Sequence, residues 1–445
     1  MSVTNSYFVA VIGAGPAGLF AARELANQGA RVVVFNRDIK PGGLAEYGVY
    51  PDKHKMKEGF RKQFRQTLAN DHLIYYGNLR VGENGDLTLD DLRTLGFQAI
   101  LVTVGAQGTK WLGLPGEDLV GVYHAKDLVY HYNKLPPFSQ EKFRLGKRCA
   151  IVGAGNVMLD IAYFMIHEVK AEEVIAIVRR GPGEVNFTKE EMTRTVANLD
   201  MDAFESEMKR VLPALNTVNQ DPELGRHKVL DALSKAEPKS GNTRFRFEFL
   251  TSPVQMLGEN GWLTKLEVED NILIAENNDV KARGTGHKRT LEVEAVVFAI
   301  GDKIDDSFGL PSASNEFVKN ATPRFPVDGT SYEAFDPKTN TSIPDVFVGG
   351  WARKASEGLV GVARKDGINA SKAIWQYLQT LKLVVPNLEV LTDKMKSLGK
   401  QIVTKEDIRK LEAVEAAEAQ KRGLEEFKFS TNEEMLQAMG LTITA

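Results

Sequence analysis

The sequence predicts an α/β fold made of two domains, each built on its own parallel sheet. The first observation is the apolar strand Phe8–Ile12, which leads into the glycine turn GAGPAG at 13–18, a helix and a second strand. The second is a similar strand, turn and helix that starts at Arg148. The third is a pair of short apolar runs, 99–104 and 293–300, that are each followed by glycine. This repetition indicates that one fold occurs twice in the chain.

The first turn has the glycine spacing of a dinucleotide-binding unit. Gly13 permits the tight turn, Gly15 lets the main chain approach a pyrophosphate, and Gly18 lets the helix pack close to the strand. The helix that follows, to about Gln28, supplies free N–H groups and the positive end of its dipole. Ala17 lies in the same turn. We therefore expect a nucleotide to bind here.

A glycine-rich loop and a basic helix follow the second strand, Arg31–Phe35. The loop at 41–49, PGGLAEYGV, has the small residues that allow the main chain to approach a ligand, and a plain surface loop is the alternative. The segment 53–70 predicts a helix that carries Arg61, Lys62 and Arg65. Such a charge run is either a solvated face or a docking surface for an acidic partner.

The second unit begins with the strand Arg148–Val152. Its turn keeps Gly153 and Gly155, the two glycines that face the phosphates, whereas Met158 stands at the third glycine position. We therefore expect a second nucleotide site with a less close approach of helix to strand.

Two arginines follow the next strand, which we place at 174–178. Arg179 and Arg180 stand where dinucleotide enzymes read the ribose of the adenosine. A carboxylate there accepts from ribose hydroxyls, whereas a 2′-phosphate repels a carboxylate and requires arginine. The pair predicts NADP rather than NAD, and surface ion pairs are the alternative.

The rest of the chain is expected to complete the two domains. Residues 205–292 lack a nucleotide motif, and we interpret them as an insertion of short strands and polar turns in the second domain. A strand at 346–348 leads to glycine-rich stretches at 349–351 and 358–361 and then to a helix. That helix would return to the first domain, with its N-terminal N–H groups beside a bound ring. The charged tail from about 388 is expected to be helical.

The predicted domain boundaries follow from these elements. The first domain comprises 1–106 and 331–445, and the second, 107–330, is inserted in it. A turn at 114–118, LPGED, marks the crossover between them.

Composition limits the class of protein. The 445 residues suffice for two or three domains, and 43% hydrophobic residues supply their cores. Lysine and arginine (56) nearly balance aspartate and glutamate (59), so charge indicates neither a nucleic-acid partner nor a membrane surface. The single cysteine, Cys149, excludes an internal disulfide and a cysteine-bound iron–sulfur cluster on this chain, and we expect it in a strand core.

Targeting and metal signals are not found in the sequence. The apolar run 8–22 follows no lysine or arginine and is broken by glycine and proline. We therefore expect no signal sequence and no membrane span, and a cytoplasmic protein. No metal-ligand cluster has a convincing spacing, so no metal is predicted.

Two dinucleotide sites on one chain suggest a flavin and a pyridine nucleotide. Hydride would then move from the nicotinamide to the flavin, and electrons would leave afterwards. The protein would supply orientation and electrostatics, and no catalytic base is strictly required.

Several stretches resemble the adrenodoxin reductase-like family of NADP-dependent ferredoxin reductases, flavoproteins with a glutathione-reductase-like fold. They are PGGLAEYGVYPDKHKMK at 41–57, LPGEDLVGVYHAKDLVYHYNKLP at 114–136, GAGNVMLD at 153–160, RRGPGEVNFTKEEM at 179–192 and GGWARKASEGLVG at 349–361. The C-terminal tail also resembles that family, so the similarity covers nearly the whole chain.

The resemblance implies two Rossmann-like domains, one for FAD and one for NADP, and a ferredoxin or similar small acidic electron carrier as partner. It assigns FAD to Gly13, Gly15, Ala17, Gly18, Asn36, Gly43, Leu44, Val49, Gly105, Gly350, Trp351, Gly358, Leu359 and Val360. It assigns NADP to Gly153, Gly155, Asn156, Val157, Arg179 and Arg180. It implies catalytic roles for Glu191, near the nicotinamide, and for Trp351 and His54.

The chain departs from the family at several of these positions. Asn36 replaces an acidic residue that accepts from the ribose of FAD, and amide oxygen is the weaker acceptor. Restoring glutamate there is expected to tighten FAD. The family motif PDHP reads PDKH at 51–54, so either Lys53 or His54 faces the flavin. The ARKASEG segment after Trp351 replaces a proline-threonine-glycine run. The arginine expected soon after Glu191 is absent at Thr193, although Arg194 follows.

Other functions remain open at this point. The chain could be an electron-input subunit of a larger redox complex, similar to the small subunit of glutamate synthase, although that family carries a cysteine-rich domain. A flavin monooxygenase has no supporting motif. A non-catalytic flavin-binding subunit is supported only by Asn36, Met158 and the altered loop.

Overall fold

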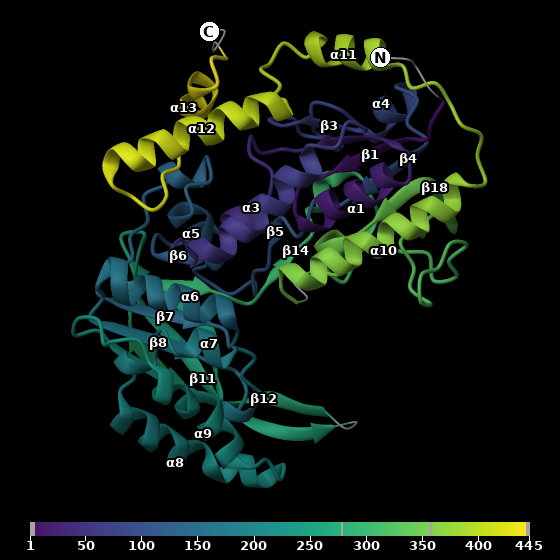
Figure 1. Ribbon diagram of the computed structural model, residues 1–445. Coiled ribbons are helices and arrows are strands. Elements are labelled where there is room, and N and C mark those ends of the chain that lie inside the picture. The colour runs from purple at the N-terminus through teal and green to yellow at the C-terminus, as the bar shows by residue number, and fades with distance from the viewer. Residues whose placement is uncertain (1–4, 277–278, 356–357, 442–445) are drawn as a thin grey trace. The chain divides into compact units, whose positions relative to one another are not determined.

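The computed structural model describes residues 5–276, 279–355 and 358–441 (Figure 1). It confirms the predicted α/β fold, because parallel sheets flanked by helices recur twice along the chain. The chain divides into two compact units, each of which is described by itself. Unit 1 comprises Met1–Gly108, Tyr130–Gln140 and Asp302–Ala445, and unit 2 comprises Thr109–Val129 and Glu141–Gly301.

Unit 1 is built on a six-stranded sheet with the order β17-β18-β4-β1-β2-β3. All neighbours are parallel except β17 and β18. The strands are β1 (Phe8–Ile12), β2 (Arg31–Phe35), β3 (Leu73–Tyr76), β4 (Ala99–Val102), β17 (Glu333–Asp336) and β18 (Thr341–Val348). Continuous apolar runs such as FVAVI and RVVVF are typical of parallel strands that are covered on both faces.

Alternate residues of β1 enter two different cores, because successive side chains point to opposite faces of a sheet. Val9 and Val11 pack with helices α1 (Pro16–Asn27) and α10 (Val360–Leu378), and with Leu411 of the C-terminal region. Phe8, Ala10 and Ile12 pack instead in a second core that includes residues from 304 to 317.

That second core explains where the boundary of unit 1 lies. Ile304, Phe308, Leu310 and Phe317 are buried with the strands of unit 1. Residues 302–330 therefore lie with unit 1, whereas the sequence placed them in the second domain. The difference arises because short apolar runs between polar turns do not show which sheet they cover.

Unit 2 contains a five-stranded sheet with the order β6-β13-β7-β8-β9. All its neighbouring pairs are parallel, and its strands are β6 (Val122–His124), β7 (Arg148–Val152), β8 (Glu173–Ile177), β9 (Arg244–Glu248) and β13 (Ala295–Phe298). The order β13-β7-β8-β9 repeats the order β4-β1-β2-β3 of unit 1. The internal duplication inferred from the two glycine-ended runs is thus present in the topology. Cys149 is fully buried in β7, as expected.

The insertion in unit 2 contains two helices that the sequence interpretation missed. They are α8 (Met201–Thr217) and α9 (Pro222–Leu230). A signal for α8 was present, because Phe204, Met208, Val211 and Leu215 have helical spacing and form its buried face. Pro213 inside the helix obscured that pattern.

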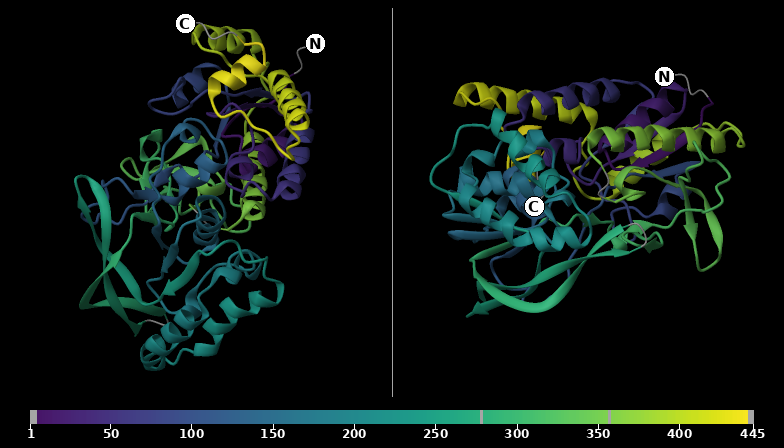
Figure 2. Two further views of the ribbon diagram at one scale, coloured as in Figure 1. Left: turned by 90° about the vertical axis from the view of Figure 1, so that its left-hand side faces the viewer. Right: turned by 90° about the horizontal axis from the view of Figure 1, so that it is seen from below.

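Residues 205–292 contain strands, as expected, but β9 in this range belongs to the parallel sheet, and the other strands are longer than the short ones expected. Thr251–Glu259 (β10), Trp262–Glu276 (β11) and Asp279–Glu292 (β12) form a three-stranded antiparallel sheet. The last two make the long curved hairpin seen from two sides in Figure 2. Most of β12 is exposed and carries charged side chains, which suits an edge strand.

The remaining elements are short or lie at the C-terminus. The helices are α2 (Leu44–Tyr47), α3 (His54–Leu68), α4 (Leu89–Thr94), α5 (Ala125–Tyr132), α6 (Asn156–Phe164), α7 (Lys189–Met192), α11 (Leu388–Ser397), α12 (Lys405–Arg422) and α13 (Asn432–Ala438). The strands are β5 (Gly108–Thr109), β14 (Asp302–Lys303), β15 (Ser312–Ala313) and β16 (Glu316–Phe317). In the part of the chain that the structure describes, no helix is both long and apolar enough to cross a membrane.

His124, at the end of β6, is held neutral inside unit 2. Its side chain is 2% exposed, and burial together with Lys126 lowers its pKa to about 4. Nδ1 accepts from the Lys126 N–H at 3.2 Å, and Nε2 lies 3.2 Å from the Gly301 carbonyl oxygen. One ring nitrogen therefore accepts and the other donates, as in neutral imidazole.

This histidine predicts a loss of stability in mild acid. In the unfolded chain His124 is protonated below about pH 6.5, whereas in the folded protein it is protonated only below about pH 4. The free energy of unfolding should therefore fall by about 3 kcal/mol between these pH values, at about 1.4 kcal/mol per pKa unit. Urea unfolding of wild type and His124→Gln across this range measures the effect. Equal pH slopes for the two proteins would contradict the assignment.

Candidate functional site

The first glycine turn is closed by main-chain contacts and open at the helix N-terminus. Gly13 has a φ of +102°, and a Cβ at Gly18 would lie 1.9 Å from the Gly13 carbonyl oxygen. A Cβ at Gly15 would meet nothing within 4 Å. Because the N-cap of α1 is Gly15, no side chain caps that helix. The turn therefore presents bare N–H groups to open space, as an anion requires.

The glycine-rich loop lies on this turn. The Gly42 N–H donates to the Ala14 carbonyl oxygen at 2.7 Å, and a Cβ at Gly43 would lie 3.1 Å from the Cα of Gly15. Leu44 begins the one-turn helix α2 directly afterwards. The predicted ligand-covering loop is thus next to the predicted phosphate-binding turn.

Asn36 ties these two segments together with its own amide. Its Oδ1 accepts from the Ala14 N–H at 3.0 Å, and its Nδ2 donates to the carbonyl oxygens of Asp38 and Lys40 at 2.8 and 3.0 Å. The side chain is 7% exposed. Both ends of the amide therefore bind main-chain groups, and the contact with the ribose of FAD stays a prediction.

The segment that contains Trp351 also lies beside the first turn. A Cβ at Gly350 would be 2.6 Å from the Cβ of Ala17. Asp366 of α10 accepts from the Gly350 N–H at 2.6 Å and from the guanidinium of Arg353 at 3.0 Å, which fixes this segment on the helix. Trp351 therefore belongs to the same part of unit 1 as the glycine turn.

The N-terminus of α10 offers an apolar surface. Leu359, its N-cap, is 65% exposed, and Val362 is 50% exposed. No side chain caps the helix at Leu359. An exposed apolar pair beside free helix N–H groups suits a flat ring with a polar edge. Ser356 and Glu357, in the segment that departs from the family pattern, lie outside the described residues.

His54 is directed elsewhere. Its Nε2 lies 3.0 Å from a carboxylate oxygen of Glu425, and its Nδ1 lies 3.4 Å from one of Glu426. Both ring nitrogens thus face the C-terminal segment rather than the glycine turn. The catalytic role of His54 stays a prediction, because these contacts do not place its ring at the glycine turn.

Two of the three cations named on the basic helix α3 bind carboxylates of the protein. Arg61 donates two bonds of 2.7 Å to Glu46 and is also paired with Glu426. Arg65 is paired with Glu58. Of the three cations named from the sequence, Lys62 alone is exposed without an ion pair to the described residues.

The second glycine turn repeats the geometry of the first. Gly155 is the N-cap of α6, no side chain caps that helix, and a Cβ at Gly155 would meet nothing within 4 Å. Val157, two residues after Gly155, is 45% exposed. Arg179 follows β8, is exposed and makes no ion pair among residues 5–276, 279–355 and 358–441. Arg180 lies 3.7 Å from Glu184.

Asn156 links the second turn to Glu191. Its Oδ1 accepts from the Thr188 N–H at 2.8 Å, and Thr188 in turn caps α7 by accepting from the Glu191 N–H at 3.3 Å. The Asn186 N–H donates to the Ala154 carbonyl oxygen at 2.8 Å. The segment 186–191 is therefore held against the turn, so the structure brings the predicted Glu191 to this site.

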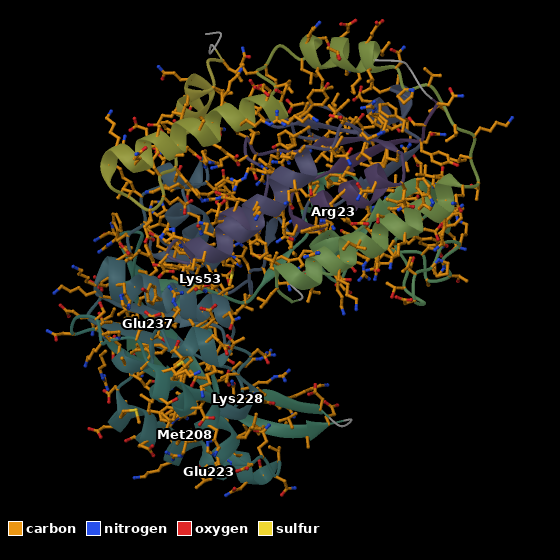
Figure 3. The ribbon with its side chains drawn as sticks, viewed as in Figure 1. Arg23, Lys53, Met208, Glu223, Lys228 and Glu237 are labelled. Atoms are coloured by element: carbon orange, nitrogen blue, oxygen red, sulfur yellow. The ribbon has the colours of Figure 1, made fainter. Side chains whose placement is uncertain are left out.

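Arg194 forms a buried ion-pair centre that the sequence interpretation did not find. It is 8% exposed, donates to Asp160 at 3.1 Å and lies 3.8 Å from the centre of the Tyr163 ring. Glu191 lies 3.6 Å away, and Glu237, labelled in Figure 3, lies 3.9 Å away. Arg194 is thus part of the interior of unit 2 and not a surface substitute for the arginine missing at Thr193.

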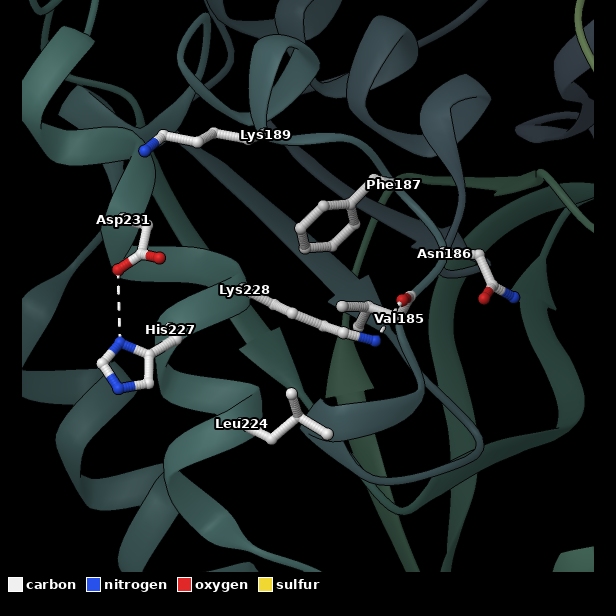
Figure 4. A pocket seen from close by; sticks show the side chains of 8 residues that line it. All are labelled: Val185, Asn186, Phe187, Lys189, Leu224, His227, Lys228 and Asp231. Carbon is white, nitrogen blue, oxygen red and sulfur yellow. Dashed lines mark hydrogen bonds and ion pairs between the residues drawn. The ribbon is translucent and has the colours of Figure 1, made fainter.

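A cavity of about 500 Å³ lies on unit 2 between α9 and the loop before α7 (Figure 4). Lys228 donates to the carbonyl oxygens of Gly183 and Val185 at 2.6 and 3.1 Å, and His227 is paired with Asp231 at 3.2 Å. Lys228, His227 and Asp231 thus bind other groups of the protein, and we assign the cavity no ligand.

Comparisons with known proteins agree with this arrangement. Residues 7–202 match the family model described as pyridine nucleotide-disulphide oxidoreductase. The chain is 27% identical to NADPH-ferredoxin reductase FprA of Mycobacterium tuberculosis, over 97% of this chain and 98% of that protein. It is 27% identical to the mitochondrial NADPH:adrenodoxin oxidoreductase of Salvelinus fontinalis, over 96% and 90% of the two chains.

A solved structure also matches the chain over nearly its whole length. The structure titled "Mycobacterium tuberculosis FprA in complex with NADPH" matches with a TM-score of 0.82 and 25% identity, over 98% of this chain and 99% of that chain. The fold class and the resemblance stated from the sequence are confirmed, and so is the class of enzyme, an oxidoreductase that uses a pyridine nucleotide. Residues 7–202 thus match the model of the pyridine nucleotide-disulphide oxidoreductase family, and the chain is similar over nearly its whole length to NADPH-ferredoxin and adrenodoxin reductases.

Proposed function

We propose that the protein is an FAD-containing oxidoreductase that takes electrons from NADPH and passes them singly to a ferredoxin-type iron–sulfur protein. The observation that carries this proposal is the pair of uncapped helix N-termini at Gly15 and Gly155. The second is followed by Arg179, which makes no ion pair to the described residues. The related reductases named above support the same cofactors and the same kind of acceptor.

Unit 1 supplies the residues that would hold FAD. The N–H groups of the first turn of α1 would receive its pyrophosphate, and the loop at 41–49 would exclude water from it. The N-terminus of α10 would stabilise negative charge on the ring. FAD, when bound, exchanges hydride with the nicotinamide and releases electrons one at a time.

Unit 2 supplies the residues that would hold NADP. The first turn of α6 would receive the pyrophosphate, and Arg179 the 2′-phosphate, with Arg180 beside it. Glu191, held through Thr188 and Asn156, would lie toward the nicotinamide end. Its carboxylate needs no proton-transfer role, because hydride transfer is chemistry of the cofactors.

A direct test follows flavin reduction by stopped-flow spectroscopy. The FAD-loaded protein should be reduced at least about ten-fold faster by NADPH than by NADH, since Arg179 binds only the 2′-phosphate. The reduced protein should then transfer electrons to at least one member of a panel of ferredoxins, with rates that fall as salt rises. Faster reduction by NADH, or no transfer to any ferredoxin, would contradict the proposal.

Arg179→Ser should separate the two nicotinamide cofactors. The KM for NADPH should rise by roughly 10–100-fold, because hydrogen bonds to a charged group contribute about 1.5–3 kcal/mol. The KM for NADH should stay within two-fold. Lys142→Ser, which removes an exposed cation of unit 2 without an ion pair to the described residues, is the matched control. An equal rise for both cofactors would show that Arg179 does not read the 2′-phosphate.

Substitution of Asn36 tests whether its amide holds the glycine-rich loop on the first turn. In Asn36→Asp the Nδ2 donor is lost, and a carboxylate oxygen faces the carbonyl oxygens of Asp38 and Lys40. Buried groups left unsatisfied cost about 1–3 kcal/mol each, so the Kd for FAD should rise by at least about five-fold. Asn36→Glu should weaken FAD for the same reason. Asn27→Asp, at an exposed position on α1, is the control, and tighter FAD binding by Asn36→Glu would restore the original expectation.

A further inference from the structure

Glu46, in the one-turn helix α2, is buried among three cations. Its side chain is 3% exposed. Its two carboxylate oxygens accept from Arg61 at 2.7 Å each, and Lys428 lies 2.8 Å and Lys40 3.7 Å away. Burial opposes its charge, yet Lys428 and Lys40 hold the pKa of this carboxyl well below its usual range. Glu46 is therefore an anion inside unit 1.

The three cations come from three different segments of the chain. Lys40 precedes the glycine-rich loop, Arg61 lies on α3, and Lys428 belongs to the segment 424–431 that follows α12. Lys428 also donates to the main-chain carbonyl oxygen of Glu46 at 3.1 Å. The C-terminal segment is therefore attached to the loop through both the side chain and the main chain of Glu46.

Two further carboxylates complete the charge cluster. Glu415 lies 2.5 Å from Lys40, and Glu426 lies 2.5 Å from Arg61. Together with Glu46 they give three carboxylates for the three cations. Lys57, which is 1% exposed and donates to Asn133 at 3.1 Å, lies 3.9 Å from Glu426 at the edge of the cluster. Burial, then Lys428, lowers its pKa to about 7.

This cluster fixes one end of the loop that lies on the first glycine turn. The start of the loop is held by the Asn36 amide, which donates to the Lys40 carbonyl oxygen. Gly42 and Gly43, which contact Ala14 and Gly15, lie between that point and Glu46. The loop cannot lift from the turn unless Glu46 separates from its cations.

A buried ion cluster often adds little net stability over apolar residues of similar size, because each charge has lost its water, but removing one partner leaves an uncompensated charge. The geometry selected here is the closed position of the loop over the turn. The tie between Glu46 and Lys428 joins segments that are 382 positions apart in the sequence.

We propose that Glu46 is a positioning residue of the FAD site and that the C-terminal segment 424–431, through Lys428, holds the glycine-rich loop closed over the bound pyrophosphate. The inference rests on the proposed function for the identity of the nucleotide. It assigns a role to a segment that lies far from the glycine turn in sequence. That role is to hold the loop in place, not to contact the cofactor.

The test measures how fast FAD leaves the purified holoprotein. After dilution, released flavin is followed by its fluorescence in wild type, Glu46→Gln and Lys428→Met. Both variants should release FAD at least ten-fold faster than wild type. The double variant should be less than additive, because each substitution breaks the same contact. Lys410→Met, which removes a C-terminal lysine paired with Asp407 in α12, is the matched control and should release FAD as wild type does.

Two readouts and one further variant separate this role from a general loss of structure. Hydrogen exchange at the Gly42 amide, which is bonded to Ala14, should accelerate in both variants, and the affinity of the apoproteins for NADP⁺ should stay within two-fold. Glu46→Asp, which keeps the charge but withdraws it from Lys428, gives a third variant if Glu46→Gln does not fold, and it should also speed FAD release.

FAD release within two-fold of wild type in all the folded variants would overturn the inference, while the proposed function would stand. A wild-type protein that does not bind FAD would contradict the proposed function itself.

Discussion

The close contact between Gly18 and the carbonyl oxygen of Gly13 is the constraint on which unit 1 depends. A side chain at Gly18 would lie 1.9 Å from that oxygen, so only glycine lets α1 start so near the end of β1. The helix then begins at Gly15 without a capping side chain and keeps its N–H groups for a ligand. The loop at 41–49, the Trp351 segment and α10 all contact this turn or its first helical residues. The site is therefore a property of main-chain packing rather than of reactive side chains.

The second turn shows how far that constraint can be relaxed. Met158 replaces the third glycine, is fully buried and joins the interior of unit 2. The N-terminus of α6 is nevertheless open at Gly155. Its neighbour Asn156 fixes the segment that carries Glu191, much as Asn36 ties the covering loop to the first turn.

Local patterns predicted the fold and both turns because their causes are local. The strands β1, β2 and β7 begin and end where their apolar runs do, and the glycine spacing alone indicated two nucleotide sites. Side-chain partners were harder to predict. Asn36, His54 and Arg61 were each given a role toward a ligand or partner, and each also contacts other groups of the protein. The partners of His54, and one of the two partners of Arg61, lie in the segment near 425, and neither spacing nor composition of the sequence indicates which distant charges meet. Removal of one member of such a buried cluster typically costs about 3–5 kcal/mol.

The central claim is that the two turns bind different nucleotides, FAD at Gly15 and NADP at Gly155. An experimental structure of the protein with both FAD and NADP⁺ tests this most directly. We expect the FAD pyrophosphate at the N-terminus of α1 and the 2′-phosphate of NADP⁺ at Arg179. A 2′-phosphate bound away from Arg179, or FAD at the turn of unit 2, would contradict it.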